Sequence, residues 1–461
     1  MNGDEKMKAK KGMRALSLLI VLALVGAMIV PVVSAEEQNE SIEEPTNSQA
    51  IFEIVGYTND FQNNVLSSSK TADSLAKEYG KLNIPSRIER YDIVQFDQVA
   101  MKTDQKNSLK VTIYDKEYTM TLGRMNFENI DDGIDSYSGS IEGLDDSVAI
   151  FTFDKNLVYG TIQLQDEIIY IKPVQNKEYA MKTAMPLHIV YSSKDVKQAE
   201  KPSRIDLDVT PLPNINLSGT YQPVENTEST SSAKSWAYVY VLVATDEEFD
   251  ELESNWVSAA QSYMAQAAYQ YERPDIGVYL NVVKYDSDSV KMASLSGDNR
   301  KYSDPLGLFF ETFTPSYLDS ENADIAIYLG GNDRSGGVQG AAWGYDNYAN
   351  PNTRNYCRYA WSQMVGDSSD FTYDGSYHAR VYCMIHEFGH IFNANHENSG
   401  GTNQAYFWYE NHIGKWTVMR SLYIGNPQNT WEYSSPSYHG DTDCNNAGAI
   451  NEVKGNIAGL A

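Results

Sequence analysis

The chain has few cysteines, few basic side chains for its size and, beyond its N-terminus, no long apolar run. Three cysteines among 461 residues are too few for a scaffold built from disulfides. Because 62 acidic side chains outnumber 36 basic ones, the formal net charge is -26, and the chain repels nucleic-acid phosphates and acidic membrane surfaces. We therefore expect no nucleic-acid partner. We also expect no stable membrane span once the N-terminal segment is removed.

The N-terminus has the composition of a secretory signal. Basic residues up to Arg14 precede the apolar stretch Ala15–Val30, and the small residues Ser34 and Ala35 offer a cleavage site. We therefore predict a signal peptide over residues 1–35 and a secreted or extracellular protein, free or associated with the cell surface. An uncleaved anchor is the alternative, because the apolar stretch is only a little shorter than the roughly 18 residues that span a bilayer.

Three regions of different character follow. Residues 36–197 contain short alternating strands separated by Gly, Asp and Asn turns, which predicts a β-rich unit. Residues 198–235 are rich in Pro, Ser and Thr and lack hydrophobic periodicity, so we predict an exposed linker. Residues 236–461 alternate strands with helices, and the apolar residues from Trp256 to Tyr271 recur at helical spacing. The clearest predicted strands are Lys110–Tyr114, Ala149–Phe153, Glu167–Ile171, Tyr238–Val243, Ile276–Val283 and Asp324–Leu329.

Three of the chain's seven histidines lie between positions 386 and 396. Residues four apart share a helix face, so His386 and His390 can present two imidazoles to one ion, with Glu387 beside it. A catalytic zinc takes about three protein ligands and keeps one position for water, and His396 is the candidate third ligand. Asn393 lies where the chain must leave the helix sharply, and asparagine tolerates the left-handed conformation that this exit needs. The pattern predicts one catalytic Zn²⁺ with Glu387 as general base. The alternative is that the histidines are ordinary surface or core residues of a helix and have this spacing by chance.

The segment HEFGHIFNANHE resembles the elongated zinc motif of the metzincin metallopeptidases, and most closely that of the adamalysin, or reprolysin, branch. The family pattern has glycine where this chain has Asn393. The resemblance implies a methionine turn beneath the zinc, for which Met419 in the segment Thr417–Ser421 is the candidate. Some metzincins have a metal-reaching tyrosine two residues after that methionine. This chain has Ser421 there, which favours the adamalysin-like branch and a site with three histidine ligands.

The same resemblance implies a binding strand for the substrate. Asp324–Leu329, followed by a Gly-rich segment, is similar to the edge strand that lies above the cleft in the family. Such a strand binds an extended peptide through backbone hydrogen bonds. Residues 429–436 are similar to the wall of the specificity pocket. The candidate substrate-binding residues of the edge strand are Gly340, Ala341, Ala342 and Trp343.

The placement of the cysteines bears on both folding and latency. Cys357 and Cys444 are similar to a disulfide pair common in adamalysins, which would leave Cys383 as a buried apolar residue. Residues 36–233 contain no cysteine, so a prodomain thiolate cannot block the zinc. Any inhibition of the peptidase by its prodomain must therefore be steric or place another type of ligand on the zinc.

The N-terminal region resembles the prodomain of adamalysin-type precursors at residues 137–143, 158–160 and 170–173. The resemblance implies that residues 36–197 are a prodomain and that this prodomain inhibits the peptidase that follows it. His188 is the one histidine of this region, and we interpret it as a structural imidazole and not as a metal ligand.

These features together predict a β-rich prodomain followed by an α/β (α+β) metzincin-like zinc peptidase domain with a twisted mixed sheet and an active-site helix. The expected function is that of a secreted zinc metalloendopeptidase, made as a precursor and acting on peptide or protein substrates. The alternatives are a zinc-containing cell-surface adhesion or binding protein with weak or no peptidase activity, and a zinc hydrolase for a non-peptide amide. A purely structural zinc has no use for Glu387, which disfavours the first alternative. The sequence leaves any Ca²⁺ requirement open.

Overall fold

A computed structural model describes the chain from Phe52 onward, with gaps, and the described residues all belong to one compact unit, Gln49–Ala461. The predicted signal peptide lies outside the described residues, and the borders predicted for the prodomain and the linker stay predictions. None of the described helices is both long and apolar enough to cross a membrane. The described residues are 52–58, 82–85, 87–96, 108–113, 116–128, 130–155, 157–174, 177–180, 186–197, 203–205, 236–297, 304–332, 338–366 and 375–461.

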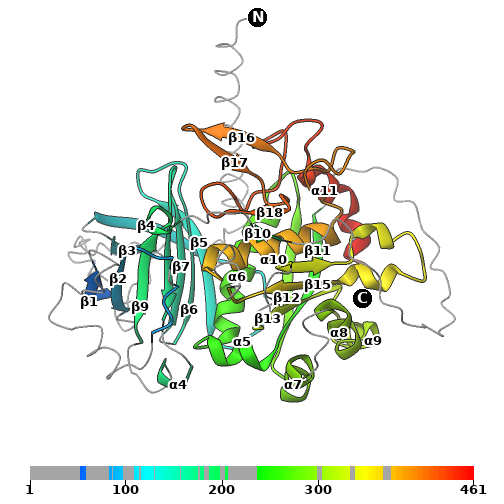
Figure 1. Cartoon of the computed structure of the whole chain (residues 1–461), viewed down its shortest axis with the longest axis horizontal. Helices are drawn as coiled ribbons and strands as arrows, with labels where there is room; N and C mark the ends of the chain where they lie inside the picture. Colours follow the sequence, from blue (N-terminus) through cyan, green and yellow to red (C-terminus); the bar gives the residue numbers. More distant parts are fainter. Residues whose placement is uncertain are drawn as a thin grey trace, which may run out of the picture. The chain divides into compact units, whose positions relative to one another are not determined.

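In the N-terminal part of the described chain, nine strands form one antiparallel sheet in the order β1-β2-β9-β8-β7-β6-β5-β4-β3 (Figure 1). Side chains alternate between its two faces, and Val94, Met120 and Phe151 belong to a core on one of them. The predicted β-rich character of this region is confirmed. The strands are β1 (Phe52–Thr58), β2 (Tyr91–Phe96), β3 (Ser108–Ile113), β4 (Lys116–Arg124), β5 (Ile134–Ile141), β6 (Val148–Asp154), β7 (Leu157–Gln163), β8 (Ile168–Pro173) and β9 (His188–Ser192).

The side chain of His188 forms hydrogen bonds to the backbone within this sheet. The amide of Val158 donates to its Nε2 at 3.0 Å, and its Nδ1 lies 3.0 Å from the carbonyl oxygen of Pro186. Burial lowers the pKa of His188 to about 3, so the ring is neutral at physiological pH. Both nitrogens therefore serve the backbone, as expected of a structural imidazole.

A second sheet, of five strands among the described residues, has the order β12-β11-β13-β15-β14 and is mixed, because β14 alone runs antiparallel to its neighbour. Its central strands are nearly continuous apolar runs, which suits a parallel sheet covered on both faces. The predicted mixed sheet is confirmed. The strands are β11 (Ala237–Thr245), β12 (Val278–Asp286), β13 (Ile325–Gly330), β14 (Gly340–Ala342) and β15 (Tyr359–Gln363).

Helix α6 (Trp256–Tyr271) packs against both sheets. Its polar side chains are buried against the N-terminal sheet: Ser258 donates to the Asp154 carboxylate at 2.6 Å, and Gln266 donates to the Thr161 hydroxyl at 2.9 Å. Its apolar residues join the core beneath the mixed sheet, as the helical periodicity predicted. The two parts of the chain therefore share one hydrophobic core across α6.

Helix α10 (Tyr377–Ile391) lies against α6, β14 and β15 and carries the histidine motif. Arg380, on its first turns, forms a buried ion pair with Glu253. Burial raises the pKa of Glu253, but the guanidinium outweighs this effect and holds the pKa below its ordinary value. The remaining helices and strands used below are α8 (Pro305–Thr312), α11 (Asn446–Ile457), β10 (Ser203–Arg204), β16 (Phe407–Glu410), β17 (Ile413–Trp416) and β18 (Leu422–Tyr423).

Candidate active site

Helix α10 places two histidines of the motif on one face. It begins after Ser376, whose side chain accepts a hydrogen bond from the Ala379 amide at 3.3 Å and so caps the first turn. His386 and His390 lie one turn apart towards its C-terminal end, and their Nε2 atoms are 3.2 Å apart. The spacing read from the sequence therefore produces the expected pair of imidazoles.

The chain leaves α10 through a left-handed residue, Asn393, with φ 65°. The Ala394 amide donates to the Gly389 carbonyl at 2.9 Å and the Asn393 amide to the His390 carbonyl at 3.2 Å, which is a Schellman arrangement. The side-chain amide of Asn403 then donates to the Asn393 carbonyl at 2.7 Å and fixes the turn. Asparagine thus takes the backbone conformation for which the family pattern has glycine, as predicted.

The turn brings His396 back to the helix. Its Nε2 lies 3.1 Å from the Nε2 atoms of both His386 and His390. A zinc ion held tetrahedrally at about 2.0–2.1 Å separates its ligand nitrogens by roughly 3.3 Å. Among the described residues, these three histidines form the one group of potential ligands close enough to hold a metal ion together. Both the ligand type and the spacing fit a single zinc.

A backbone carbonyl orients the first of these rings. The Nδ1 atom of the buried His386 lies 2.7 Å from the carbonyl oxygen of Val418. Because a carbonyl only accepts, Nδ1 carries the proton, and Nε2 keeps its lone pair for a metal. Sequence reasoning missed this contact, since a carbonyl acceptor distant in the chain leaves no mark on residue type.

Glu387 is fully buried and lies against strand β14. A Cβ atom added to Gly340 would be 2.2 Å from Glu387 Oε1, so the absence of a side chain at position 340 gives the carboxylate its place. Glu387, which lies between His386 and His390 in the sequence, is thus directly beside strand β14 at the edge of the sheet. The sequence predicted both residues as functional but did not indicate that they touch.

Met419 packs beneath the helix at another glycine. A Cβ atom on Gly389 would lie 2.3 Å from Met419 Sδ and 3.0 Å from a ring carbon of Tyr433. The Tyr433 hydroxyl donates to the Ile385 carbonyl at 2.6 Å, one residue before His386. The methionine and the tyrosine therefore support the motif from below, and glycine within the motif permits their close approach.

Replacing Gly389 with alanine is expected to destabilise the protein by about 1–3 kcal/mol, because the new methyl group overpacks against Met419. Gly455→Ala is the matched control, since Gly455 is a helical glycine of α11 with no atom within 4 Å of an added Cβ. That change is expected to stabilise the protein by about 0.4–1 kcal/mol. Urea unfolding of the two variants measures both effects. Equal or greater stability of Gly389→Ala would contradict the packing argument.

Glu397, the residue after His396, connects the loop of His396 to the segment that follows Met419. Glu397 accepts a hydrogen bond from the Ser421 amide at 2.9 Å and another from the Ser421 hydroxyl at 2.8 Å. Ser421, the position at which some metzincins carry a metal-reaching tyrosine, therefore connects two loops through Glu397 in this protein. This contact was also missed, because it joins two polar residues whose types alone suggest only exposure.

The predicted disulfide between Cys357 and Cys444 is wrong. All three cysteines of the chain lie in described residues, and the thiols of Cys357 and Cys444 are free. Cys357 is buried and donates its thiol to the Arg354 carbonyl at 2.8 Å, whereas Cys444 is half-buried in the turn before α11. Cys383 is buried as predicted, and its thiol donates to the Gln339 carbonyl at 3.1 Å.

The predicted edge strand needs a partial correction. Strand β14 is at the edge of the mixed sheet, but β13, which contains most of Asp324–Leu329, lies inside the sheet between β11 and β15. Strand β15 was not anticipated and separates β13 from β14. Trp343 is 1% exposed and packs its ring on Phe310 of α8. Its side chain therefore belongs to the core.

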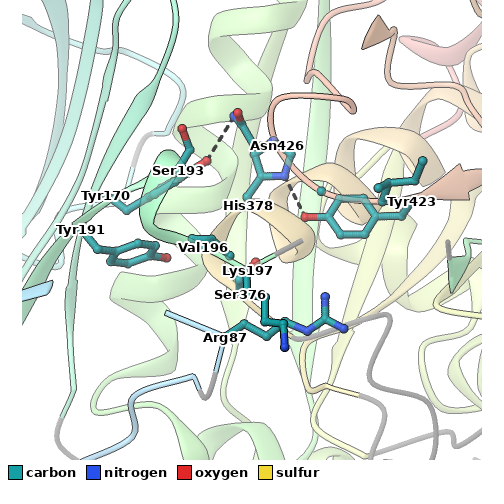
Figure 2. A pocket seen from close by; sticks show the side chains of 12 residues that line it. Arg87, Tyr170, Tyr191, Ser193, Val196, Lys197, Ser376, His378, Tyr423 and Asn426 are labelled. Carbon is teal, nitrogen blue, oxygen red and sulfur yellow. Dashed lines mark hydrogen bonds between the residues drawn. The ribbon is translucent and has the colours of Figure 1, made fainter. Parts of the chain in front are cut away.

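A small cavity of about 20 Å³ lies beside the first turn of α10, and none of the three clustered histidines lines it (Figure 2). Its wall includes His378, whose Nδ1 is 2.9 Å from the Tyr423 hydroxyl, and Asn426, whose amide donates to the Tyr170 hydroxyl at 3.4 Å. Burial lowers the pKa of His378 to about 3, which keeps the ring neutral. The space suits roughly one water molecule, so it cannot take a substrate.

Residues 257–397 match the model of the family described as metallo-peptidase family M12B, reprolysin-like. Metalloproteinase-II from Bacteroides fragilis shares 15% identity with a TM-score of 0.43, over 74% of this chain and 92% of that one. A solved chaperone–substrate complex shares 17% identity with a TM-score of 0.35, over 50% of this chain, which spans only 36% of that one. No curated protein matches the chain. The matched residues include the motif helix and all three clustered histidines, so this part of the chain is similar to the reprolysin-like metallopeptidases.

Proposed function

We propose that the protein is a secreted zinc-dependent metalloendopeptidase, made as a precursor, with Glu387 as its general base. The observation that carries the proposal is the convergence of three Nε2 atoms within 3.2 Å of one another, two of them on the helix that also carries the buried Glu387. Zinc bound there supplies Lewis acidity and lowers the pKa of a bound water to about 7. His386, His390 and His396 would hold it.

Glu387 performs the proton transfers. Its carboxylate accepts a proton from the attacking water and later delivers that proton to the leaving amine. The burial of the side chain and its close contact with Gly340 keep the carboxylate in one place beside the edge of the sheet. A group fixed in this way loses little entropy when the reaction begins.

The substrate is proposed to be a peptide or protein chain in extended form. Among the described residues, strand β14 pairs with β15 on one side only. On its other side the Gly340 amide donates to the Ile205 carbonyl, so this edge has a backbone group that can bind a further strand. Backbone recognition of this kind favours polypeptides over small amides. Zinc content measured together with cleavage of a denatured protein tests the proposal: zinc without cleavage would favour the adhesion or binding protein, and cleavage of small amides alone would favour a non-peptide hydrolase.

Maturation is expected to cut the polar linker between about Gln198 and Lys234, because its Pro-, Ser- and Thr-rich composition suggests exposed backbone. The mature enzyme would then begin shortly before β11, with the mixed sheet intact. N-terminal sequencing of the active form measures the cut. A mature start within residues 100–190 would refute the division into prodomain and peptidase, since strands β3 to β8 of the nine-stranded sheet lie there.

A further inference from the structure

Arg420 lies in the segment that directly follows Met419, close to the candidate catalytic centre. The carbonyl of Val418, two residues before it, accepts a hydrogen bond from His386, and Met419 packs beneath the motif helix. The carbonyl of Arg420 itself accepts a hydrogen bond from the Tyr382 hydroxyl of α10 at 2.9 Å. The backbone of Arg420 is therefore fixed to the helix that carries two of the three proposed zinc ligands.

The segment that contains Arg420 is also one wall of a groove whose other wall is β14. The Ser421 carbonyl accepts a hydrogen bond from the Ile205 amide at 2.8 Å, and the Ile205 carbonyl accepts one from the Gly340 amide of β14 at 2.9 Å. Extended backbone therefore fits between the two walls, next to Gly340, against which Glu387 lies. Because Arg420 directly precedes Ser421, its long side chain is within reach of the side chains of a peptide bound there.

The side chain of Arg420 lies over an aromatic ring. Its guanidinium carbon is 4.6 Å from the centre of the Trp416 ring, at the end of β17. The side chain is half-buried, and burial lowers the pKa of Arg420, although Tyr382 and Glu397 oppose this effect. Stacking uses the flat face of a guanidinium and leaves the N–H groups in its plane available to a carboxylate.

No acidic side chain of the described residues binds this guanidinium. It has neither a hydrogen bond nor an ion pair there, and its Nε is buried without a partner. The Glu397 carboxylate accepts two hydrogen bonds from Ser421 instead. Three other buried arginines each form an ion pair, namely Arg273 with Asp275, Arg358 with Asp319 and Arg380 with Glu253. Arg420 thus differs from them, in a chain with 62 acidic side chains, by keeping its donors for a partner from outside.

We infer that Arg420 is a specificity-determining residue, which binds the carboxylate of an aspartate or glutamate side chain of the substrate close to the cleaved bond. The inference rests on the proposed function and names the class of polypeptide that this site prefers. A guanidinium can form two parallel charge-assisted hydrogen bonds with one carboxylate. The net charge of -26 repels acidic substrates at long range, and a local cation offsets that repulsion where the acidic side chain binds.

The test measures peptide cleavage by the full chain after maturation, as wild type and as Arg420→Gln. The peptides form pairs that differ only by Glu or Gln at one position near the cleaved bond, and all have an amidated C-terminus, so only a side-chain carboxylate varies. We expect wild type to cleave the Glu peptide of the best pair with a kcat/KM at least about 10-fold higher than that of its Gln partner. Arg420→Gln is expected to lose this preference because its activity on the Glu peptide falls.

Two more variants make the result specific. Lys415→Gln removes the same charge from β17, but Lys415 is already ion-paired with Glu410, so this control is expected to keep the preference of wild type. Arg420→Lys keeps the charge without the planar donors and should retain only part of the preference. Wild type without any preference for Glu would overturn the inference. An equal loss of preference in Lys415→Gln would also overturn it, because the effect would then be one of overall charge.

Binding separates a failure of this inference from a failure of the proposed function. Fluorescence anisotropy measures the Kd of the same peptides, labelled with a fluorophore, for the matured full chain stripped of metal. The Glu peptide is expected to bind wild type at least about 10-fold more tightly than it binds Arg420→Gln. Such binding without cleavage by the zinc-loaded protein would contradict the peptidase and support the role of Arg420. Cleavage with no difference between Glu and Gln peptides would support the peptidase and contradict that role.

Discussion

Glu387→Gln is expected to keep zinc bound and to lower kcat for peptide hydrolysis by about 100- to 10,000-fold, the usual contribution of a positioned acid–base group. Glutamine has nearly the same shape, so it fits beside Gly340, where the carboxylate now lies. Its amide cannot accept a proton from water. The three histidine ligands are untouched, and the metal should remain.

Kinetics with a peptide substrate and metal analysis of the same preparation measure the two halves of this result. Glu452→Gln, an exposed position on α11, is the matched control and should leave both zinc content and kcat unchanged. Full activity of Glu387→Gln would contradict the proposed mechanism. Loss of zinc together with activity would instead assign the carboxylate a role in holding the metal.

His396→Ala is expected to lower zinc affinity and activity together. The remaining pair, His386 and His390, supplies two nitrogens 3.2 Å apart on one helix face, which is an incomplete zinc site. Because metal affinity depends on the number of ligands that the fold holds ready, the variant should lose zinc to a mild chelator that leaves wild type loaded. Activity should fall with the zinc content.

His412→Asn is the control for this change. His412 is exposed in the turn between β16 and β17, where its φ of 66° suits asparagine, and it lies outside the cluster of three histidines. Zinc titration with a competing chelator compares the two variants. An unchanged stoichiometry and affinity in His396→Ala would mean that the third ligand is another residue.

The errors in the sequence reasoning share a physical origin. The disulfide between Cys357 and Cys444 was inferred by resemblance. A disulfide requires the fold to bring two thiols close together, and the sequence around each cysteine does not tell whether this happens. The internal position of β13 depends on β15, a short strand with polar residues at its end that inserts between β13 and β14. Strand order is a property of the packed sheet and leaves no local pattern.

The segment Ser203–Ile205 is a second case. It lies within residues 198–235, which have the composition of a linker, yet it pairs with β18 and its last carbonyl accepts from the Gly340 amide of β14. Composition reports that a segment cannot form a core by itself. It does not report that Ile205 can complete a core formed by others.

By itself the sequence determined what depends on neighbours in the chain. The four-residue spacing of His386 and His390 and the left-handed exit at Asn393 follow from backbone hydrogen bonds within a few residues, so residue type predicts them. Tertiary structure alone decided the contacts of Glu387 with Gly340 and of Met419 with Gly389. These contacts join residues about 30 to 50 positions apart, and packing brings them together only after the sheet, the helix and the methionine segment have found their places.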